Sequence, residues 1–139
     1  MTPTEDRIRA SFARQSLMAT FGAAVVSVAD GAVTLTAPLT DAVRQQHGAG
    51  HAGLTFALAD TAAGYAALTL MPQGREVMTV EAKINLLAPA LGDSLIARGR
   101  VLRAGRRLVV VTAEVAAVAA GRETVIALLQ GTMIPVDRA

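Results

Sequence analysis

The stretch His47–Met71 constrains the fold of this chain more than any other segment. It opens with a glycine-rich loop and continues as a run of small and apolar residues, in which Asp60 is the only charged side chain. We expect residues 52–71 to form a helix that is buried on nearly all sides and is ended by Pro72 and Gly74. A lone carboxylate in such a helix is costly unless it is hydrogen-bonded, so Asp60 is the first candidate for a functional residue.

A membrane span is the alternative interpretation of the same run, because its length and apolarity would suit a bilayer. An aspartate near the centre of such a span costs roughly 2.5–3.5 kcal/mol on insertion scales. The surrounding chain alternates as β-strands, which a single-span protein would not need. A buried helix within a soluble domain is therefore the better interpretation.

Length and composition limit the class of protein. The 139 residues fit a single domain over 1–139. Hydrophobic residues make up 53% of the chain and aromatic residues only 3%, so small aliphatic side chains fill the core, and the apolar excess favours an oligomer.

The net charge of +2 comes without runs of like charge, which argues against nucleic-acid binding. Cysteine is absent, which excludes disulfides and thiolate chemistry. Residues 1–12 lack the order of a secretion signal, so we expect a cytoplasmic protein.

Outside the central helix, the chain reads as one further helix and six strands. Residues 4–21 have helical spacing and predict an N-terminal helix that acts as a lid or packing flap. Asp30-Gly31 between two β-branched runs predicts a hairpin of strands 23–28 and 32–37, followed by a loop over 39–50. Four alternating runs joined by short turns predict a four-strand antiparallel meander, over 77–86, 94–102, 108–118 and 124–134. The alternation of the first run places five side chains on one face: Val77, Thr79, Glu81, Lys83 and Asn85. The predicted fold class is α+β, with about six antiparallel strands curled around one long helix.

The entry to the central helix has the outline of an oxyanion hole. The first backbone N–H groups of a helix are unpaired and carry partial positive charge. Gly50 and Gly53 leave room for a carbonyl oxygen to approach these groups. Asp60 lies roughly 12–13 Å further along the helix by its rise, so it cannot easily serve the hole of its own chain. A dimer with two such helices side by side could place one chain's Asp60 near the other chain's loop.

Two segments carry a resemblance to a known family: QQHGAGHAGLTFALADTAAGYAALTL and the following TVEAKINLLAPA. They resemble the hotdog-fold acyl-CoA thioesterases of the phenylacetate-degradation (PaaI-like) type, and the likeness extends from Val25 to Pro135. The resemblance implies a hotdog fold and hydrolysis of an acyl-CoA without a cofactor. It also implies homodimers with a continuous sheet through strand 77–86, assembled into homotetramers, with active sites at the dimer interface.

The same resemblance assigns roles to single residues. Asp60 matches the catalytic carboxylate, which acts as general base for water or as nucleophile. Ala52 matches the glycine whose N–H polarises the carbonyl. Gly53 matches the following glycine, and His51 matches the histidine that opens the helix. Gln45 lies where many relatives have an asparagine that orients the carbonyl or the water. Thr79 lies where relatives have a hydroxyl near the water.

Each candidate also has a structural interpretation. Asp60 could bond a neighbouring loop, Gln45 could be a surface loop residue, and Thr79 is a good strand former. For His51 we favour a capping role at the helix start. His47 and His51 have a spacing that could bind zinc, but no third ligand is obvious, so we expect no metal site.

The substrate side is less constrained by the sequence. Leu54, Phe56 and Ala57 are candidates for the mouth of the acyl pocket, although Phe56, like Tyr65, is expected in the core. Coenzyme A phosphates need basic partners, and the candidates are Arg103, Arg106 and Arg107 around the Ala104-Gly105 turn, or else Arg98 and Arg100. The turn arginines could equally be a solvated hairpin.

Two other functions are compatible with the same fold. Hotdog dehydratases or hydratases of acyl thioesters usually pair a histidine with the acid and carry a His-Phe-Pro-Gly type loop, which is absent here. A non-catalytic acyl-CoA-binding or sensing module would bind without turnover. The thioesterase is our preferred prediction because such a module has no use for Asp60 as a catalyst.

Overall fold

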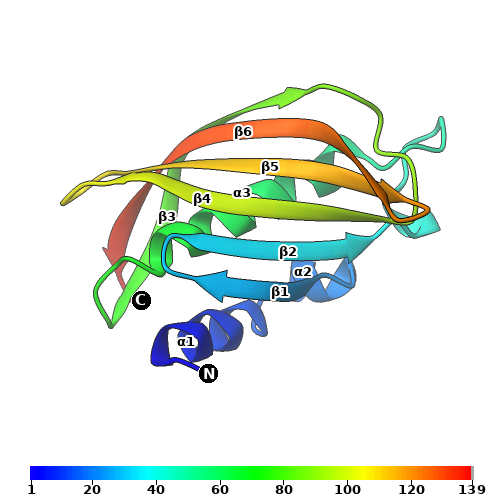
Figure 1. The fold of residues 1–139 in the computed structure, drawn as a ribbon. Coiled ribbons are helices and arrows are strands. Elements are labelled where there is room, and N and C mark those ends of the chain that lie inside the picture. The colour runs from blue at the N-terminus through cyan, green and yellow to red at the C-terminus, as the bar shows by residue number, and fades with distance from the viewer. Residues whose placement is uncertain (139) are drawn as a thin grey trace.

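The structure is a computed structural model that describes residues 1–138, and it confirms the α+β class with a sheet wrapped around one helix (Figure 1). The elements in chain order are α1 (Pro3–Phe12), α2 (Ser16–Thr20), β1 (Ala24–Ala29), β2 (Ala32–Pro38), the short 3-10 helix η1 (Asp41–Val43), α3 (Ala52–Leu68), β3 (Arg75–Leu86), β4 (Ser94–Ala104), β5 (Val109–Ala119) and β6 (Arg122–Asp137). The strands form one antiparallel sheet in the order β1-β2-β4-β5-β6-β3. None of the helices within residues 1–138 combines the length and apolarity that crossing a bilayer requires.

The central helix α3 is buried against the sheet but leaves one stripe of its surface open. Its inward positions have no exposed surface, and they are mostly alanine: Leu58, Ala59, Ala62, Ala63, Ala66 and Ala67. The open stripe consists of exposed or half-buried residues at helical spacing: Ala52, Gly53, Phe56, Ala57, Asp60 and Thr61. The prediction of burial on nearly all sides was therefore wrong for this stripe, and Phe56, which is 39% exposed, does not belong to the core. Within residues 1–138, no element covers this stripe beyond the contact of Asp60 with Thr79 of β3.

The sheet and the helix approach most closely at Gly99 of β4. A Cβ built at this position would overlap the carbonyl group of Ala62 and the backbone nitrogen of Ala63 on α3. A helix that is rich in alanine presents almost bare backbone to the sheet, so only glycine fits opposite it. This contact fixes the distance between the helix and the strands that carry the site.

We expect Gly99→Ala to destabilise the fold by about 1–3 kcal/mol, because the backbone of β4 or α3 must move to admit the methyl group. Thermal melting measures the loss. Gly64→Ala on α3 is the matched control, since its Cβ would meet only ordinary contacts at 3.9 and 4.0 Å. Equal melting temperatures for Gly99→Ala and the wild type would contradict this close approach.

The last four strands do not form the predicted meander. Strands β4, β5 and β6 do follow one another, but β3 pairs with β6 at the edge of the sheet. The connection 87–93 runs across the ends of β6 and β5: the Leu87 N–H bonds to the Ile126 carbonyl at 2.7 Å, and the Asp93 N–H bonds to the Val118 carbonyl at 2.7 Å. This segment is long enough to pass two strands, because neighbouring strands lie only about 4.8 Å apart. Alternation within a strand carries no information about its partner.

A β-bulge in β3 reverses the predicted faces of that strand. The register with β6 shifts between Thr79 and Glu81, which leaves Val80 as the extra residue. Thr79 therefore faces α3, while Glu81 lies on the outer face of the sheet and bonds to Thr132 at 2.7 Å. The prediction that all five alternating residues share one face was wrong, because a bulge shifts the alternation by one position. The polar residues that follow the bulge, Lys83 and Asn85, line the same outer face as Glu81.

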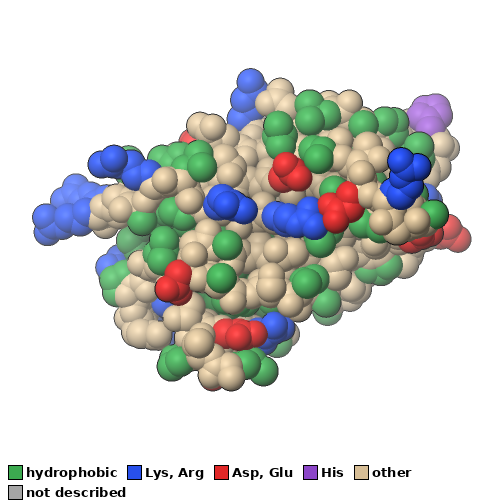
Figure 2. Space-filling model, viewed as in Figure 1, with side chains coloured by type: hydrophobic (Ala, Val, Ile, Leu, Met, Phe, Trp, Pro, Cys, Tyr) green, Lys and Arg blue, Asp and Glu red, His purple; other side chains and the backbone are tan. Residues whose placement is uncertain are grey.

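Strand β3 ends the sheet, and its outer edge has no neighbouring strand among residues 1–138. It is 12 residues long, and Met78 and Val80 are each 55% exposed. A long edge with exposed apolar side chains is a template for pairing with another chain. The outer face of the sheet is different in character, since Figure 2 shows basic and acidic side chains interspersed over it.

The N-terminal segment forms two helices rather than the single one predicted, with a break over residues 13–15. It packs against the domain as expected: Ile8 is fully buried, and the Arg7 guanidinium donates to the carbonyls of Leu68, Met71, Pro72 and Arg75 at the end of α3. Burial lowers the pKa of Arg7 from its ordinary value, while the nearby Glu76 carboxylate opposes that change. The segment is therefore attached at the end of α3 opposite to the glycine-rich loop.

Candidate active site

Asp60 and Thr79 form a bonded pair between α3 and the edge strand β3. The Thr79 hydroxyl donates to Asp60 Oδ1 at 2.8 Å and lies 3.1 Å from Met133 Sδ. Asp60 Oδ2 has no hydrogen-bond partner among residues 1–138. Both side chains border a pocket of about 180 Å³. The carboxylate is therefore held by one oxygen and free to act on a ligand with the other.

His51 caps the N-terminus of α3, as its favoured structural interpretation predicted. Its Nδ1 accepts the Gly53 N–H at 2.7 Å, and its carbonyl accepts the N–H groups of Leu54 and Thr55. Among residues 1–138, the Ala52 N–H has no acceptor. The N–H of Gly53 is occupied by the cap, so Ala52 offers the one free donor at the start of the first helical turn.

Loss of this cap should be measurable as a loss of stability. We expect His51→Ala to cost about 1 kcal/mol, because the Gly53 N–H loses its acceptor. His51→Asn should recover most of that loss, since asparagine is among the best N-cap residues. Chemical denaturation of the two variants and the wild type checks the order. A His51→Ala protein that is as stable as the wild type would show that the cap contributes nothing to the free energy of unfolding.

The glycine-rich loop is closed by Gln45. Its backbone N–H bonds to the Ala49 carbonyl at 2.8 Å, its carbonyl accepts the Gly48 N–H at 3.0 Å, and its side-chain Oε1 accepts the His47 N–H. Gly50 borders the pocket at Ala52, and its lack of a side chain also allows the loop to pack closely. A Cβ there would meet Leu39 at 2.7 Å and Ala90 at 3.0 Å, so glycine is needed for close packing of the loop.

Gln45, His51 and Ala52 border a second and larger pocket of about 560 Å³. Its other walls come from Thr55 of α3, from Ile126 of β6, from the segment 86–90 at the end of β3 and beyond, and from the loop residues Gln46, Ala49 and Gly50. Sequence reasoning missed Thr55, although it lies one helical turn after Ala52 and could have been found from that spacing. It could not find the connection 86–90, which reaches the loop only through the Gly50–Ala90 bridge.

The two halves of the candidate site lie apart on one chain. The pocket at Asp60 and the pocket at Ala52 share no lining residue. Asp60 lies eight positions after Ala52 on α3, which corresponds to a rise of about 12 Å. The structure therefore brings Asp60 to Thr79, and Ala52 to Gln45 and His51, but does not join these two groups.

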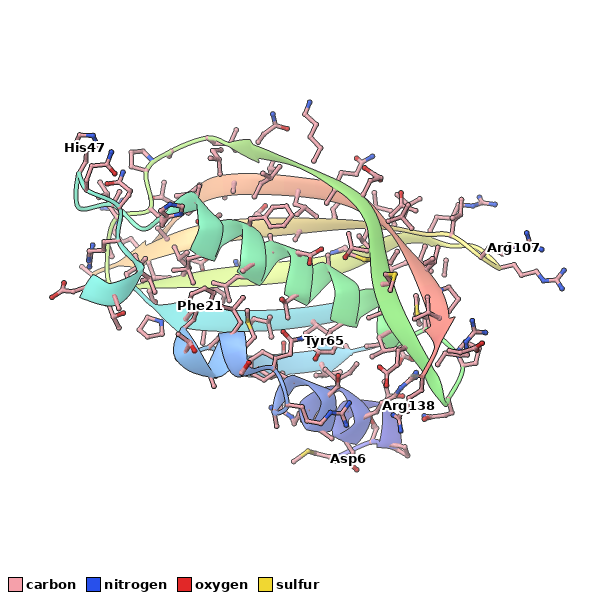
Figure 3. The ribbon with its side chains drawn as sticks, turned by 180° about the vertical axis from the view of Figure 1, so that it is seen from behind. Asp6, Phe21, His47, Tyr65, Arg107 and Arg138 are labelled. Atoms are coloured by element: carbon pink, nitrogen blue, oxygen red, sulfur yellow. The ribbon has the colours of Figure 1, made fainter. Side chains whose placement is uncertain are left out.

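The predicted substrate-binding residues lie outside both pockets. Leu54 is only 2% exposed and packs in the core. The exposed arginines Arg103, Arg106 and Arg107 lie around the tip of the β4–β5 hairpin, and Figure 3 shows Arg107 at the end of the molecule opposite to His47. One chain by itself does not bring this turn to the glycine-rich loop.

The alternative arginines lie on the outer face of the sheet, away from α3. Arg98 and Arg100 border a hollow of about 770 Å³ there. Arg98 forms two bonds to the Glu123 carboxylate, at 2.7 and 2.9 Å. This pairing raises the pKa of Arg98 and holds the pKa of Glu123 below its ordinary value. Within residues 1–138, no group of three histidine, aspartate or glutamate side chains is placed to hold a metal ion.

Comparison with known proteins agrees with this architecture. The model of the thioesterase superfamily matches residues 47–120. A thioesterase family protein from Silicibacter pomeroyi shares 41% identity, with a TM-score of 0.94 over 97% of this chain and 99% of that one. The conserved protein PA5202 from Pseudomonas aeruginosa shares 31% identity, with a TM-score of 0.79 over 88% and 94%. The PaaI protein from the phenylacetic acid degradation operon of E. coli shares 25% identity, with a TM-score of 0.85 over 96% and 93%. No curated protein sequence matches the chain.

The family model covers residues 47–120, which include α3 and β3 with Ala52, Asp60 and Thr79, as well as β4 and β5. The Silicibacter protein matches this chain over nearly the full length of both. The resemblance noted in the sequence is thereby confirmed at the level of fold and superfamily. By its sequence and by its six-stranded sheet around α3, this chain belongs to the thioesterase superfamily and has the hotdog fold.

Proposed function

We propose that this protein is an acyl-CoA thioesterase that hydrolyses an acyl thioester to the free acid and CoA, at a site shared by two chains. One observation carries the proposal. On one chain, the unpaired backbone N–H of Ala52 lies in a different pocket from Asp60, whose Oδ1 is bonded to Thr79 and whose Oδ2 is available to a ligand. Each group is half of a thioester hydrolase site. A second chain that supplies the missing half completes it.

The free edge of β3 is the natural place for this second chain. Antiparallel pairing of two β3 strands would extend the sheet across the dimer and cover the exposed Met78 and Val80. It would also bring the open stripe of α3, including Phe56 and Asp60, against the partner. Two such dimers would then form the homotetramer that the family resemblance suggests.

The proposed reaction uses the two half-sites together. The thioester carbonyl oxygen accepts the Ala52 N–H, which stabilises the negative charge of the tetrahedral intermediate. Asp60 of the partner subunit takes a proton from water through Oδ2, while Thr79 holds Oδ1. The water oxygen bonds to the carbonyl carbon, the C–S bond breaks, and the proton passes to the departing CoA sulfur. Gln45 orients the water or the carbonyl with its side-chain amide. Gly53 donates its N–H to His51 and so takes part in the helix cap.

Thiol release from a panel of acyl-CoAs, monitored with a chromogenic thiol reagent, tests the proposal. We expect turnover of at least one member. If no acyl-CoA releases thiol while calorimetry shows that one of them binds, the protein is an acyl-CoA-binding module. If an enoyl-CoA loses its conjugated absorbance without releasing thiol, the protein is a hydratase.

A further inference from the structure

We infer that Gln15 and Tyr65 form the end wall of the acyl pocket and limit the length of the acyl group that this enzyme accepts. The inference rests on the proposed function, and it identifies two specificity-determining residues of the same site. The pocket beside Asp60 has a volume of about 180 Å³ and is bordered by Gly64 and Tyr65 of α3, by Val77 and Thr79 of β3, and by Gln15 from the break between α1 and α2. The N-terminal segment thus contributes a wall.

The end wall is held in place by polar bonds. Gln15 Nε2 donates to the Tyr65 hydroxyl at 2.8 Å, and Ser11 Oγ lies 3.0 Å from the same oxygen. The Phe12 ring packs against the Tyr65 ring with centroids 6.3 Å apart. Tyr65 itself is only 4% exposed, and it lies on the side of α3 that faces the N-terminal helices (Figure 3). The Tyr65 ring is thus held by hydrogen bonds to its hydroxyl and by contact with the Phe12 ring, so it forms a fixed wall of the pocket.

The size of this pocket decides which part of the substrate it takes. Its volume on one chain, about 180 Å³, is roughly a third of the 560 Å³ of the pocket at Ala52. The nucleotide and pantetheine arm of CoA are far larger and carry charged phosphates. They fit the wider pocket at Ala52 and the surface beyond it. The pocket at Asp60 therefore takes the acyl group, and the wall made by Gln15 and Tyr65 sets how far the chain can extend on this side.

Gly64 offers a way to shorten the pocket without damaging the fold. A Cβ at this position would lie 3.9 Å from Met133 Cε and 4.0 Å from Val77 Cγ1, which are ordinary contacts. Alanine also suits a helix interior better than glycine, by roughly 0.5–1 kcal/mol. Gly64→Ala thus adds one methyl group beside Val77 in the pocket wall and preserves α3.

The test measures kcat/KM for saturated acyl-CoAs from acetyl to dodecanoyl in four proteins: the wild type, Gly64→Ala, Gln15→Ala and the control Arg14→Ala. We expect kcat/KM of the wild type to fall beyond the chain length at which the acyl group reaches the wall made by Gln15 and Tyr65. Gly64→Ala should lower kcat/KM for the longest accepted chain by about 10-fold or more, because one methylene is worth ~10–200-fold in such a pocket. Gln15→Ala should extend the range to longer chains. The exposed Arg14 lies next to Gln15 but outside the pocket, so its variant should keep the wild-type profile.

Tyr65→Phe separates the ring from the hydroxyl and should shift the profile in the direction of Gln15→Ala, but by less. The same acyl-CoAs are titrated by calorimetry, so that the dependence on chain length is measured even without turnover. Turnover with one unchanged profile in all variants would overturn the inference and leave the thioesterase proposal standing. Binding that shifts with Gly64→Ala and Gln15→Ala, without thiol release, would overturn the thioesterase proposal and retain the pocket.

Discussion

Asp60→Asn should lower kcat by about 10²–10⁴-fold, which is the usual contribution of a general base, and should leave the fold intact. The amide has the shape of the carboxylate, and its oxygen can still accept the Thr79 hydroxyl that now bonds to Oδ1 at 2.8 Å. It cannot take a proton from water. The effect should therefore appear in turnover with the best acyl-CoA, while KM and the melting temperature change little.

Thr79→Val is the matched control for this prediction. It removes the hydroxyl that holds the carboxylate but keeps the carboxylate itself, so its loss of kcat should be smaller than that of Asp60→Asn. Full activity of Asp60→Asn would show that the carboxylate takes no part in the reaction. Unfolding of Asp60→Asn would instead assign it a structural role. A single turnover in ¹⁸O-labelled water tests direct attack by Asp60. Such attack releases CoA and forms an anhydride, whose hydrolysis at the aspartyl carbon leaves the label on Asp60, whereas general-base catalysis leaves it only in the acid product.

Ala52→Pro should lower kcat by about 10²–10³-fold, since it removes the one free N–H at the entry to α3. Proline is well suited to this position, because Ala52 is the first residue of the helix. The preceding His51 has φ −67° and ψ 140°, which is the extended conformation that a residue before proline prefers. The substitution thus deletes a donor without breaking the helix.

Ala52→Val controls for the bulk of the proline ring, because it adds a branched side chain and keeps the N–H. We expect Ala52→Val to retain far more activity than Ala52→Pro in the thiol release assay. Equal losses in the two variants would mean that side-chain volume at the pocket, and not the N–H, accounts for the effect.

Mixing the two main variants tests whether the site spans two chains. A heterodimer of one Asp60→Asn chain and one Ala52→Pro chain, purified through two different tags, contains one site with both groups intact if the site is shared. Its activity should return to about half that of the wild-type dimer, as expected for two equivalent sites related by a two-fold axis. If each chain carried a complete site, both sites of the heterodimer would stay inactive.

Much of the fold could be predicted from local signals. The apolar run after the glycine-rich loop predicted α3, and Asp30-Gly31 predicted the β1–β2 hairpin, whose strands pair around that turn. The lone charge in the run singled out Asp60. The family resemblance identified the superfamily. These signals are readable because helix periodicity and turn chemistry depend on residues within a few positions of one another.

The remaining features depend on contacts between distant segments. The pairing of β3 with β6, the bulge at Val80 and the close approach at Gly99 follow from how the sheet wraps around a helix of alanines.

The pocket beside Asp60 shows the same difference between local and tertiary information. The sequence by itself determined which helix carries the carboxylate and where that helix begins. Only the tertiary structure decided that Gln15, 45 residues before Asp60, reaches the same pocket through its bond to Tyr65. The reason is physical: periodicity fixes which face of an element is apolar, whereas packing of one element on another selects the side chains that meet.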